Sequence, residues 1–249
     1  MRNIKLLLEY DGTNFVGWQT QENGRSVQEE ITKVLSQVLQ EPINLIGAGR
    51  TDSGVHARGQ VANFRSNSTL VTKSILSALN GMLPDDISVR SAVEVHENFH
   101  ARYDARGRVY RYYISQRPLA IGRQYHWHVK QALDLDVMNA LGSEILGEHD
   151  FESFCKSVAE LDNCRCTVSE SKWEKIQPAS SGGNGTLVYE ICANRFLHGM
   201  VRSLVGTMVD IGRGSTPASA FQDIMSAKDR RKAGMTAPPH GLFLEEVRY

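Results

Sequence analysis

Residues 47–65 read GAGRTDSGVHARGQVANFR. Four glycines surround one carboxylate, Asp52, and Arg50 and Arg58 lie on either side of it. Glycines at this density favour tight turns over a regular helix or strand. Apolar residues precede and follow the stretch, so it predicts a shaped loop between two strands. A guanidinium beside the acid would keep the carboxylate ionised.

Two phosphate-binding loops share part of this spacing. Gly49 and Gly54 have the spacing of a P-loop, but neither the lysine nor the magnesium-binding hydroxyl residue follows. A dinucleotide-binding fingerprint would begin at Gly47, but its third glycine comes too late. Both loops are therefore rejected. A tight turn in which Asp52 only caps backbone amides stays open as an alternative.

The longer pattern GxGRTDxGVHAxxQV, over residues 47–61, resembles the signature of the tRNA pseudouridine synthase A family. Further motifs of this family follow one another in order along essentially the whole chain. They are YDG at 10–12, GWQ at 17–19, FHAR at 99–102, YRY at 110–112, GEHDF at 147–151, NRFLH at 194–198 and APPHGLFL at 237–244. Agreement of so many motifs in register is not expected by chance.

The resemblance implies isomerisation of uridine to pseudouridine at positions 38, 39 and 40 in the anticodon stem-loop of tRNA. The target base would be flipped out of its stack, and neither a cofactor nor a metal ion would take part. Asp52 would be the catalytic carboxylate, acting as a nucleophile at the sugar C1′ or as a base that starts elimination to a glycal. Tyr110 would stack on the uracil and manage the C5 proton. Arg202 would orient Asp52, Arg50 would contact phosphate, and Leu244 would close the apolar wall of the pocket. The family works as a homodimer, so a homodimer is expected.

Hydrophobic periodicity predicts an α+β fold with an extended, mostly antiparallel sheet flanked by helices. The resemblance implies the pseudouridine synthase-like version of this fold, in which two similar lobes border a central active-site cleft. We place the lobes at residues 1–105, which carry the Asp52 loop, and at 106–249. Residues 180–185 read SSGGNG and predict a hairpin connection in the second lobe.

Two helices are predicted with particular detail. A capping box at Ser26 to Glu29 predicts the start of the first helix. The stretch 196–211 is apolar around most of its circumference, which predicts a nearly buried helix. Arg195, His198 and Arg202 would project from one side of that helix. A buried guanidinium needs an anionic partner, and we propose Asp52, while a structural ion pair elsewhere in the core stays open.

Charge is balanced overall, with 28 basic and 28 acidic residues, which argues against a general polyanion-binding protein. The stretch 102–123 is locally basic, because it contains six arginines, no lysine and one acid. Three tyrosines interleave with these arginines, at positions 110, 112 and 113. Such a pattern suits contact with phosphates beside base stacking, although a solvated strand face has the same charge pattern.

The chain has no apolar run of 18 residues and no targeting segment, so we expect a cytoplasmic protein without a membrane span. Its four cysteines lack the spacing of a zinc site and predict free thiols. His56 and His198 also lack metal-ligand spacing and are expected to be packed or loop residues.

Two other function classes fit parts of the sequence. A non-catalytic RNA-binding protein would keep the basic and aromatic residues, but it would not need Asp52, Tyr110 and Arg202 together. A nucleosidase or glycosidase usually needs a second carboxylate or an aspartate cluster, and only Asp52 is evident.

Overall fold

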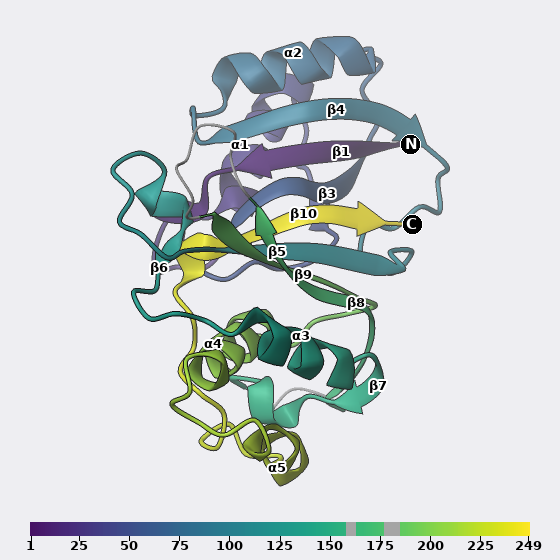
Figure 1. Ribbon diagram of the computed structural model, residues 1–249. Coiled ribbons are helices and arrows are strands. Elements are labelled where there is room, and N and C mark those ends of the chain that lie inside the picture. The colour runs from purple at the N-terminus through teal and green to yellow at the C-terminus, as the bar shows by residue number, and fades with distance from the viewer. Residues whose placement is uncertain (158–162, 177–184) are drawn as a thin grey trace. The chain divides into compact units, whose positions relative to one another are not determined.

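The computed structural model describes residues 1–157, 163–176 and 185–249, and its chain forms two compact units (Figure 1). The first unit comprises Met1–Arg106 together with Phe243–Tyr249, and the second comprises Gly107–Leu242. The predicted second lobe, 106–249, included the last strand of the chain. In the structure, residues 243–249 group with the first unit instead, because the last strand pairs with a strand of that unit.

The first unit contains a mostly antiparallel sheet in the order β4, β1, β3, β10. Strand β1 (Arg2–Tyr10) pairs antiparallel with β3 (His56–Ser66) on one side and with β4 (Ile87–Val95) on the other. The short β2 (Ile46–Gly47) also pairs antiparallel with β3. Strand β10 (Leu242–Arg248) pairs parallel with β3, with Phe243 opposite His56.

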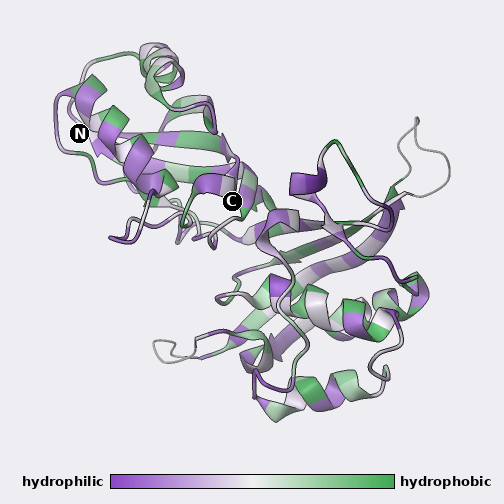
Figure 2. Ribbon diagram, turned by 90° about the vertical axis from the view of Figure 1, so that its left-hand side faces the viewer, coloured by the Kyte–Doolittle hydropathy of each residue, from purple (hydrophilic) through white to green (hydrophobic). Residues whose placement is uncertain are grey.

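The helices of the first unit cover this sheet with their apolar sides. Helix α1 (Val27–Leu39) begins after Ser26, whose Oγ accepts a hydrogen bond from the Glu29 N–H at 3.4 Å. This bond confirms the predicted helix start at Ser26. Helix α2 (Thr72–Met82) runs alongside β4. The helices carry hydrophilic and hydrophobic residues in turn, as expected for amphipathic helices (Figure 2).

The second unit repeats the combination of an antiparallel sheet and helices. Its strands lie in the order β5 (Gly107–Ser115), β9 (Thr186–Ala193), β8 (Arg165–Ile176) and β7 (Gly147–Asp150), and β6 (Trp127–His128) pairs parallel with β5. Its helices are α3 (Leu135–Glu144), α4 (Met200–Gly212) and α5 (Ala220–Ala227). Short 3-10 helices complete the two units, at Gly12–Asn14, Arg123–Tyr125, Glu152–Phe154 and Pro239–Gly241. The predicted α+β class with mostly antiparallel strands is therefore confirmed.

Helix α4 begins later than predicted. Gly199 caps its first turn in the left-handed region, at φ +71°, a conformation that glycine adopts without strain. Arg195 and His198 precede this cap and lie outside the helix. The prediction that they share one side of a helix with Arg202 is therefore wrong. The left-handed conformation of Gly199 cannot continue a right-handed helix toward residue 195, so the helix begins only at Met200.

The burial of α4 agrees with the prediction. Arg202 and Asp210 are its two residues that are not buried. A Cβ added at Gly206 would lie 1.7 Å from the Met235 carbonyl oxygen, so only glycine lets that backbone come so close. This close backbone contact fixes the position of α4 against the segment around Met235.

The predicted hairpin connection falls, over residues 180–184, outside the described residues. The strands on either side of it do pair, with Ile176 opposite Thr186. In the described parts of the chain, no helix has the length and apolar character needed to cross a membrane.

Candidate active site

Asp52 lies in a turn of the first unit, between β2 and β3. A single antiparallel bridge joins Asp52 to Gly17, and the Val55 N–H donates a hydrogen bond to the Asp52 carbonyl at 3.1 Å. Gly54 bends the chain at φ +75°. The Asp52 side chain is half-buried in this turn. The backbone around the carboxylate is therefore fixed on both sides.

Two glycines of the first motifs let the segment 10–18 lie directly against this turn. A Cβ at Gly12 would be 2.0 Å from the Val55 carbonyl oxygen, and a Cβ at Gly17 would be 2.6 Å from the Thr51 carbonyl oxygen. The buried Tyr10 hydroxyl lies 2.8 Å from Thr51 Oγ1. Burial raises the pKa of Tyr10 to about 12, so this phenol stays neutral at physiological pH.

Phe15 connects that segment to the residues just after Asp52. Its carbonyl oxygen accepts hydrogen bonds from the Gly54 N–H at 3.3 Å and from the Ser53 hydroxyl at 3.2 Å. Its ring is buried, with 3% exposed. The position of Phe15 therefore sets the path of the backbone that leaves Asp52.

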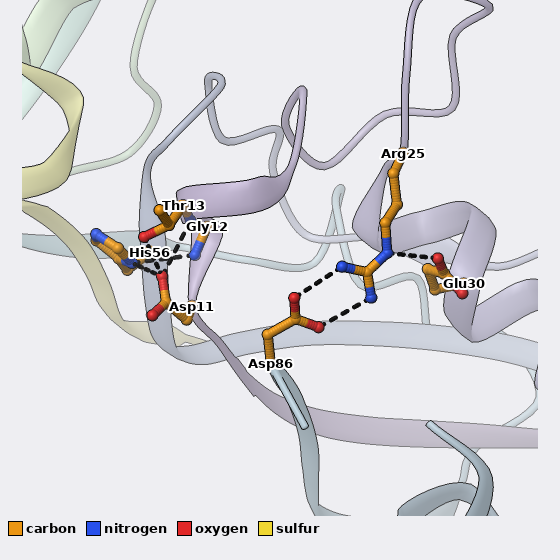
Figure 3. Close-up of polar contacts among 7 residues, drawn as sticks. All are labelled: Asp11, Gly12, Thr13, Arg25, Glu30, His56 and Asp86. Atoms are coloured by element: carbon orange, nitrogen blue, oxygen red, sulfur yellow. Dashed lines mark hydrogen bonds and ion pairs between the residues drawn. The ribbon is translucent and has the colours of Figure 1, made fainter. Parts of the chain in front are cut away.

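Arg25 holds Phe15 from the other side. Its guanidinium carbon lies 4.3 Å from the centroid of the Phe15 ring. Asp86 accepts two hydrogen bonds from Arg25, at 2.7 and 2.9 Å, and Glu30 accepts a third from Nε at 2.6 Å (Figure 3). The bonds to Asp86 raise the pKa of Arg25, partial burial opposes this rise, and the bond to Glu30 adds to it, so Arg25 stays charged. We call Arg25, Asp86, Glu30 and Phe15 the arginine clamp.

His56, at the start of β3, is a packed histidine, as predicted. It is 1% exposed and stacks on Phe243 with ring centroids 4.6 Å apart. Its Nδ1 lies 3.0 Å from both the Gly12 nitrogen and an Asp11 carboxylate oxygen (Figure 3). His198, in the loop before α4, is exposed.

Three predicted site residues belong to the first unit. Arg50 is exposed and lies two residues before Asp52. Leu244 is fully buried on β10, where it pairs with Ala57 of β3. The parallel pairing of β10 thus brings Leu244 next to the strand that follows the Asp52 turn.

The other two predicted site residues belong to the second unit. Tyr110 lies on β5 opposite Ile191, and its ring meets Phe196 edge-on, with centroids 5.1 Å apart. Arg202, on α4, donates from Nε to the Ala237 carbonyl oxygen at 2.8 Å. Since Asp52 and Arg202 belong to different units, their pairing stays a prediction.

The neighbours of Arg202 could not be read from the sequence. The Ala237 N–H donates back to the Arg202 carbonyl at 3.0 Å, so α4 and the segment before β10 are tied twice. Burial raises the pKa of Tyr112, and the nearby charge of Arg202 opposes that rise. The sequence could indicate only that Arg202 needs a polar partner, because it is a charged residue in an otherwise apolar helix.

The basic stretch 102–123 is divided between the units, with Arg102 and Arg106 in the first. Two of its arginines, both on β5, have structural partners on β9 or just after it. Arg111 forms an ion pair with Glu190 at 2.6 Å, and Arg108 donates to the Asn194 carbonyl at 2.7 Å. The sequence did not reveal these partners, because they lie on β9 and just after it.

The four cysteines are buried thiols, and burial raises the pKa of Cys166 to about 12. Within the described ranges, Asp150, Glu152 and Cys164 offer atoms within 4.8 Å of one another that could hold a cation. Lys228 lies 2.7 Å from Asp150 and lowers its pKa against the effect of burial. A lysine thus already supplies a positive charge there.

Comparison with known proteins identifies the family of this chain. A family model described as tRNA pseudouridine synthase matches residues 7–104 and 143–249. A relative from Acetivibrio thermocellus, named tRNA pseudouridine synthase A, is 43% identical over 251 residues and is aligned over 100% of both chains. One from Clostridium perfringens, named tRNA pseudouridine synthase A 2, is 40% identical, again over 100% of both. The crystal structure of an archaeal Nop10–Cbf5 complex matches at a TM-score of 0.37 and 10% identity, covering 84% of this chain and 43% of that chain, a likeness too weak to carry an argument. The family model and the full-length relatives show that this chain belongs to the tRNA pseudouridine synthase family.

Proposed function

We propose that this protein isomerises uridine to pseudouridine at positions 38, 39 and 40 in the anticodon stem-loop of tRNA, with Asp52 as the catalytic carboxylate and without a cofactor. The match to the family and to full-length relatives supports the reaction and tRNA as its substrate. The observation that carries the role of Asp52 is its turn, in which a half-buried carboxylate sits on a backbone fixed by Gly17, Gly54 and Phe15.

The reaction breaks the N1–C1′ bond, turns the released uracil and joins C5 to C1′. The proton lost from C5 balances the proton gained at N1, so no other reactant is consumed. Asp52 either attacks C1′ and forms a covalent adduct, or removes the C2′ proton so that uracil leaves and a glycal forms. Both routes need an ionised carboxylate in a fixed position beside the sugar.

Tyr110 is the aromatic partner of the reacting base in this proposal. Its ring would stack on the uracil, and its hydroxyl would manage the C5 proton after the new bond has formed. The edge-on contact with Phe196 restricts the tilt of the ring. Leu244 would supply the apolar wall of the pocket.

Arg202 would pair with Asp52 and keep the carboxylate ionised and oriented. Two features support this role: Arg202 is one of the two residues of α4 that are not buried, and the bond from Nε to the Ala237 carbonyl restricts the orientation of the guanidinium. The paired guanidinium would offset the cost of holding the acid in a partly dry site.

The substrate would be held through its backbone. Arg50 and arginines of the 102–123 stretch would contact phosphates, which would support the flipped-out state of the target base. We further infer that the protein acts as a homodimer, because the resemblance to the family implies one. We also infer a cytoplasmic location, because a tRNA substrate favours it.

Release of tritium from 5-tritiated uridine tests the proposed function. An anticodon stem-loop transcript with uridines at positions 38 to 40 should release tritium and contain pseudouridine afterwards. A matched transcript with cytidines at these positions should not be modified. Free uracil in place of pseudouridine would indicate a nucleosidase, and tight binding without tritium release would indicate a non-catalytic RNA-binding protein.

The arginine clamp gives a prediction for a residue remote from the reacting base. Arg25→Met is expected to lower kcat about 10-fold and to leave KM for tRNA within about threefold, because a small shift of Phe15 would move the Asp52 turn. Arg25→Lys should be intermediate, since it keeps the charge and loses the two-pronged contact with Asp86. Steady-state kinetics on the stem-loop transcript measure both values.

The control for Arg25 is Arg2→Met. Arg2 pairs with Glu94 at 3.0 Å and donates to the Ser68 and Leu70 carbonyls, none of which belongs to the Asp52 turn, so its loss should leave kcat near that of the wild type. An unchanged kcat in a folded Arg25→Met variant would show that the turn keeps its shape without the clamp.

A further inference from the structure

Tyr103 is an exposed aromatic residue in the first unit, just after the FHAR motif. Its side chain is 74% exposed. The centroid of its ring lies 4.3 Å from that of the His100 ring, with 32° between the planes, and the Arg102 guanidinium carbon lies 5.7 Å from it. We call His100, Arg102 and Tyr103 the aromatic platform. Single exposed apolar residues are common on protein surfaces, so exposure alone does not indicate a binding site. What distinguishes Tyr103 is therefore the set of contacts that fix its segment.

The backbone of the platform is anchored to the core by side chains. The Ala101 N–H donates to Asn63 Oδ1 at 2.8 Å, and the Tyr249 hydroxyl donates to the Ala101 carbonyl, also at 2.8 Å. Asn3 Nδ2 donates to the Phe99 carbonyl at 2.8 Å. The Asn3 and Asn63 amides, both buried, are joined by a further bond of 2.9 Å. Buried amides on β1 and β3 therefore fix a segment that ends in an exposed ring.

His100 fixes the platform from within. Its Nδ1 lies 3.2 Å from the backbone nitrogens of both Arg102 and Tyr103 and accepts from their N–H groups. The Asp104 carboxylate accepts from the His100 N–H at 2.9 Å, and the Asp104 N–H donates to the His100 carbonyl at 3.1 Å. The exposed ring is thus pre-organised, so a ligand that stacks on it orders little further.

The surroundings of the platform are basic on average. Arg65 donates to the Glu97 carbonyl at 2.9 Å and Arg106 follows Asp104 by two residues, so with Arg102 three exposed arginines stand against the acids Glu97 and Asp104. Asp104 is engaged by the His100 backbone. A ring beside arginines suits an unpaired nucleobase followed by its phosphate, because every base presents a π-face to an aromatic side chain.

We propose that an unpaired nucleobase of the tRNA substrate, other than the one that reacts, stacks on Tyr103, and that Arg102 contacts the adjoining phosphate. This inference rests on the proposed function, since that function makes tRNA the ligand. Neither Tyr103 nor His100 belongs to the residues to which the chemistry is assigned.

Binding of the unmodified anticodon stem-loop transcript, followed by fluorescence anisotropy, tests the proposal. Tyr103→Ala should raise Kd about 5- to 150-fold, which corresponds to the about 1–3 kcal/mol lost when one stacking side chain is removed. Tyr103→Phe keeps the ring and should stay within about twofold. Val71→Ala, which shortens another exposed side chain of the first unit, 61% exposed, is the control and should leave Kd unchanged.

Salt dependence separates the two contacts of the platform. Arg102→Gln should reduce the slope of log Kd against log salt by about one, because one phosphate contact is lost. Tyr103→Ala should weaken binding without changing that slope, since stacking releases no counterion.

Three results would overturn the proposal: an unchanged Kd in Tyr103→Ala, an equal loss in Tyr103→Phe, or a loss confined to kcat at saturating tRNA. The first would show that the ring binds nothing, the second that the hydroxyl is what matters, and the third that Tyr103 acts in the chemistry. If the wild type binds the transcript through Tyr103 but releases no tritium, the proposed function fails while the platform stands.

Discussion

Replacing Asp52 with asparagine or alanine is expected to abolish tritium release, with a loss on the order of 10⁴-fold or more, as for other enzymes that lose the group that attacks the substrate. Binding of the stem-loop transcript should stay within about threefold. In the proposed mechanism Asp52 supplies a charged oxygen that is nucleophilic or basic, whereas asparagine keeps the shape of the side chain with a neutral and far less reactive oxygen. Single-turnover kinetics with excess enzyme measure the chemical step, and anisotropy measures binding.

The control for this substitution is Asp85→Asn. Asp85 is an exposed acid of the same unit, so its neutralisation changes the net charge equally without touching the turn. It should retain the turnover of the wild type. Turnover close to that of the wild type in Asp52→Asn would remove Asp52 from the mechanism, and a large loss of binding would assign it to recognition of the substrate.

Arg202→Met is expected to lower turnover by about 10²-fold, the scale of a displaced catalytic group. Under the proposed pairing, the variant would lose the cation that orients Asp52, while the methionine retains much of the packing of the stem. The structure adds a stability cost, because the buried Ala237 carbonyl would lose the donor at 2.8 Å. A lost partner of this kind costs about 1–3 kcal/mol, which urea denaturation can measure.

Two further variants distinguish catalysis from structure at this position. Arg202→Lys keeps the charge without the planar fork, so partial turnover is expected. Arg213→Met removes an arginine at the end of the same helix, where it pairs with Asp210 at 2.5 Å, and should leave turnover unchanged. An Arg202→Met variant that is less stable yet fully active per folded molecule would return Arg202 to a purely structural role.

The sequence predicted the parts of the fold that depend on local patterns. Hydrophobic periodicity indicated the α+β class, and the capping box located the first residue of α1. The glycines around Asp52 correctly indicated a turn, since a positive φ at Gly54 is a local requirement of the chain. Arg202 was expected to be a buried guanidinium, whereas the structure leaves it as one of the two residues of α4 that are not buried.

Contacts between distant segments could not be predicted in this way. Arg25 and Asp86 are 61 residues apart, and neither has an unusual neighbour in the sequence. The start of α4 was missed because the apolar pattern continues through residues 196–201, whereas the φ of Gly199 depends on the packing of the preceding loop. The grouping of the last strand with the first unit depends on its pairing with β3, which lies far away in the chain.

The parallel pairing of β10 with β3 has a consequence for the order in which the first unit is completed during synthesis. Its first three long strands emerge early, but Phe243 and Leu244 can pair with His56 and Ala57 only after residues 242–248 have also left the ribosome. The ion pair between Arg58 and Glu245, at 2.8 Å, spans 187 residues and has to wait for the same event. Contacts between such distant segments form late in folding. A nascent chain therefore presents the Asp52 turn without the strand beside it until residues 242–248 have emerged.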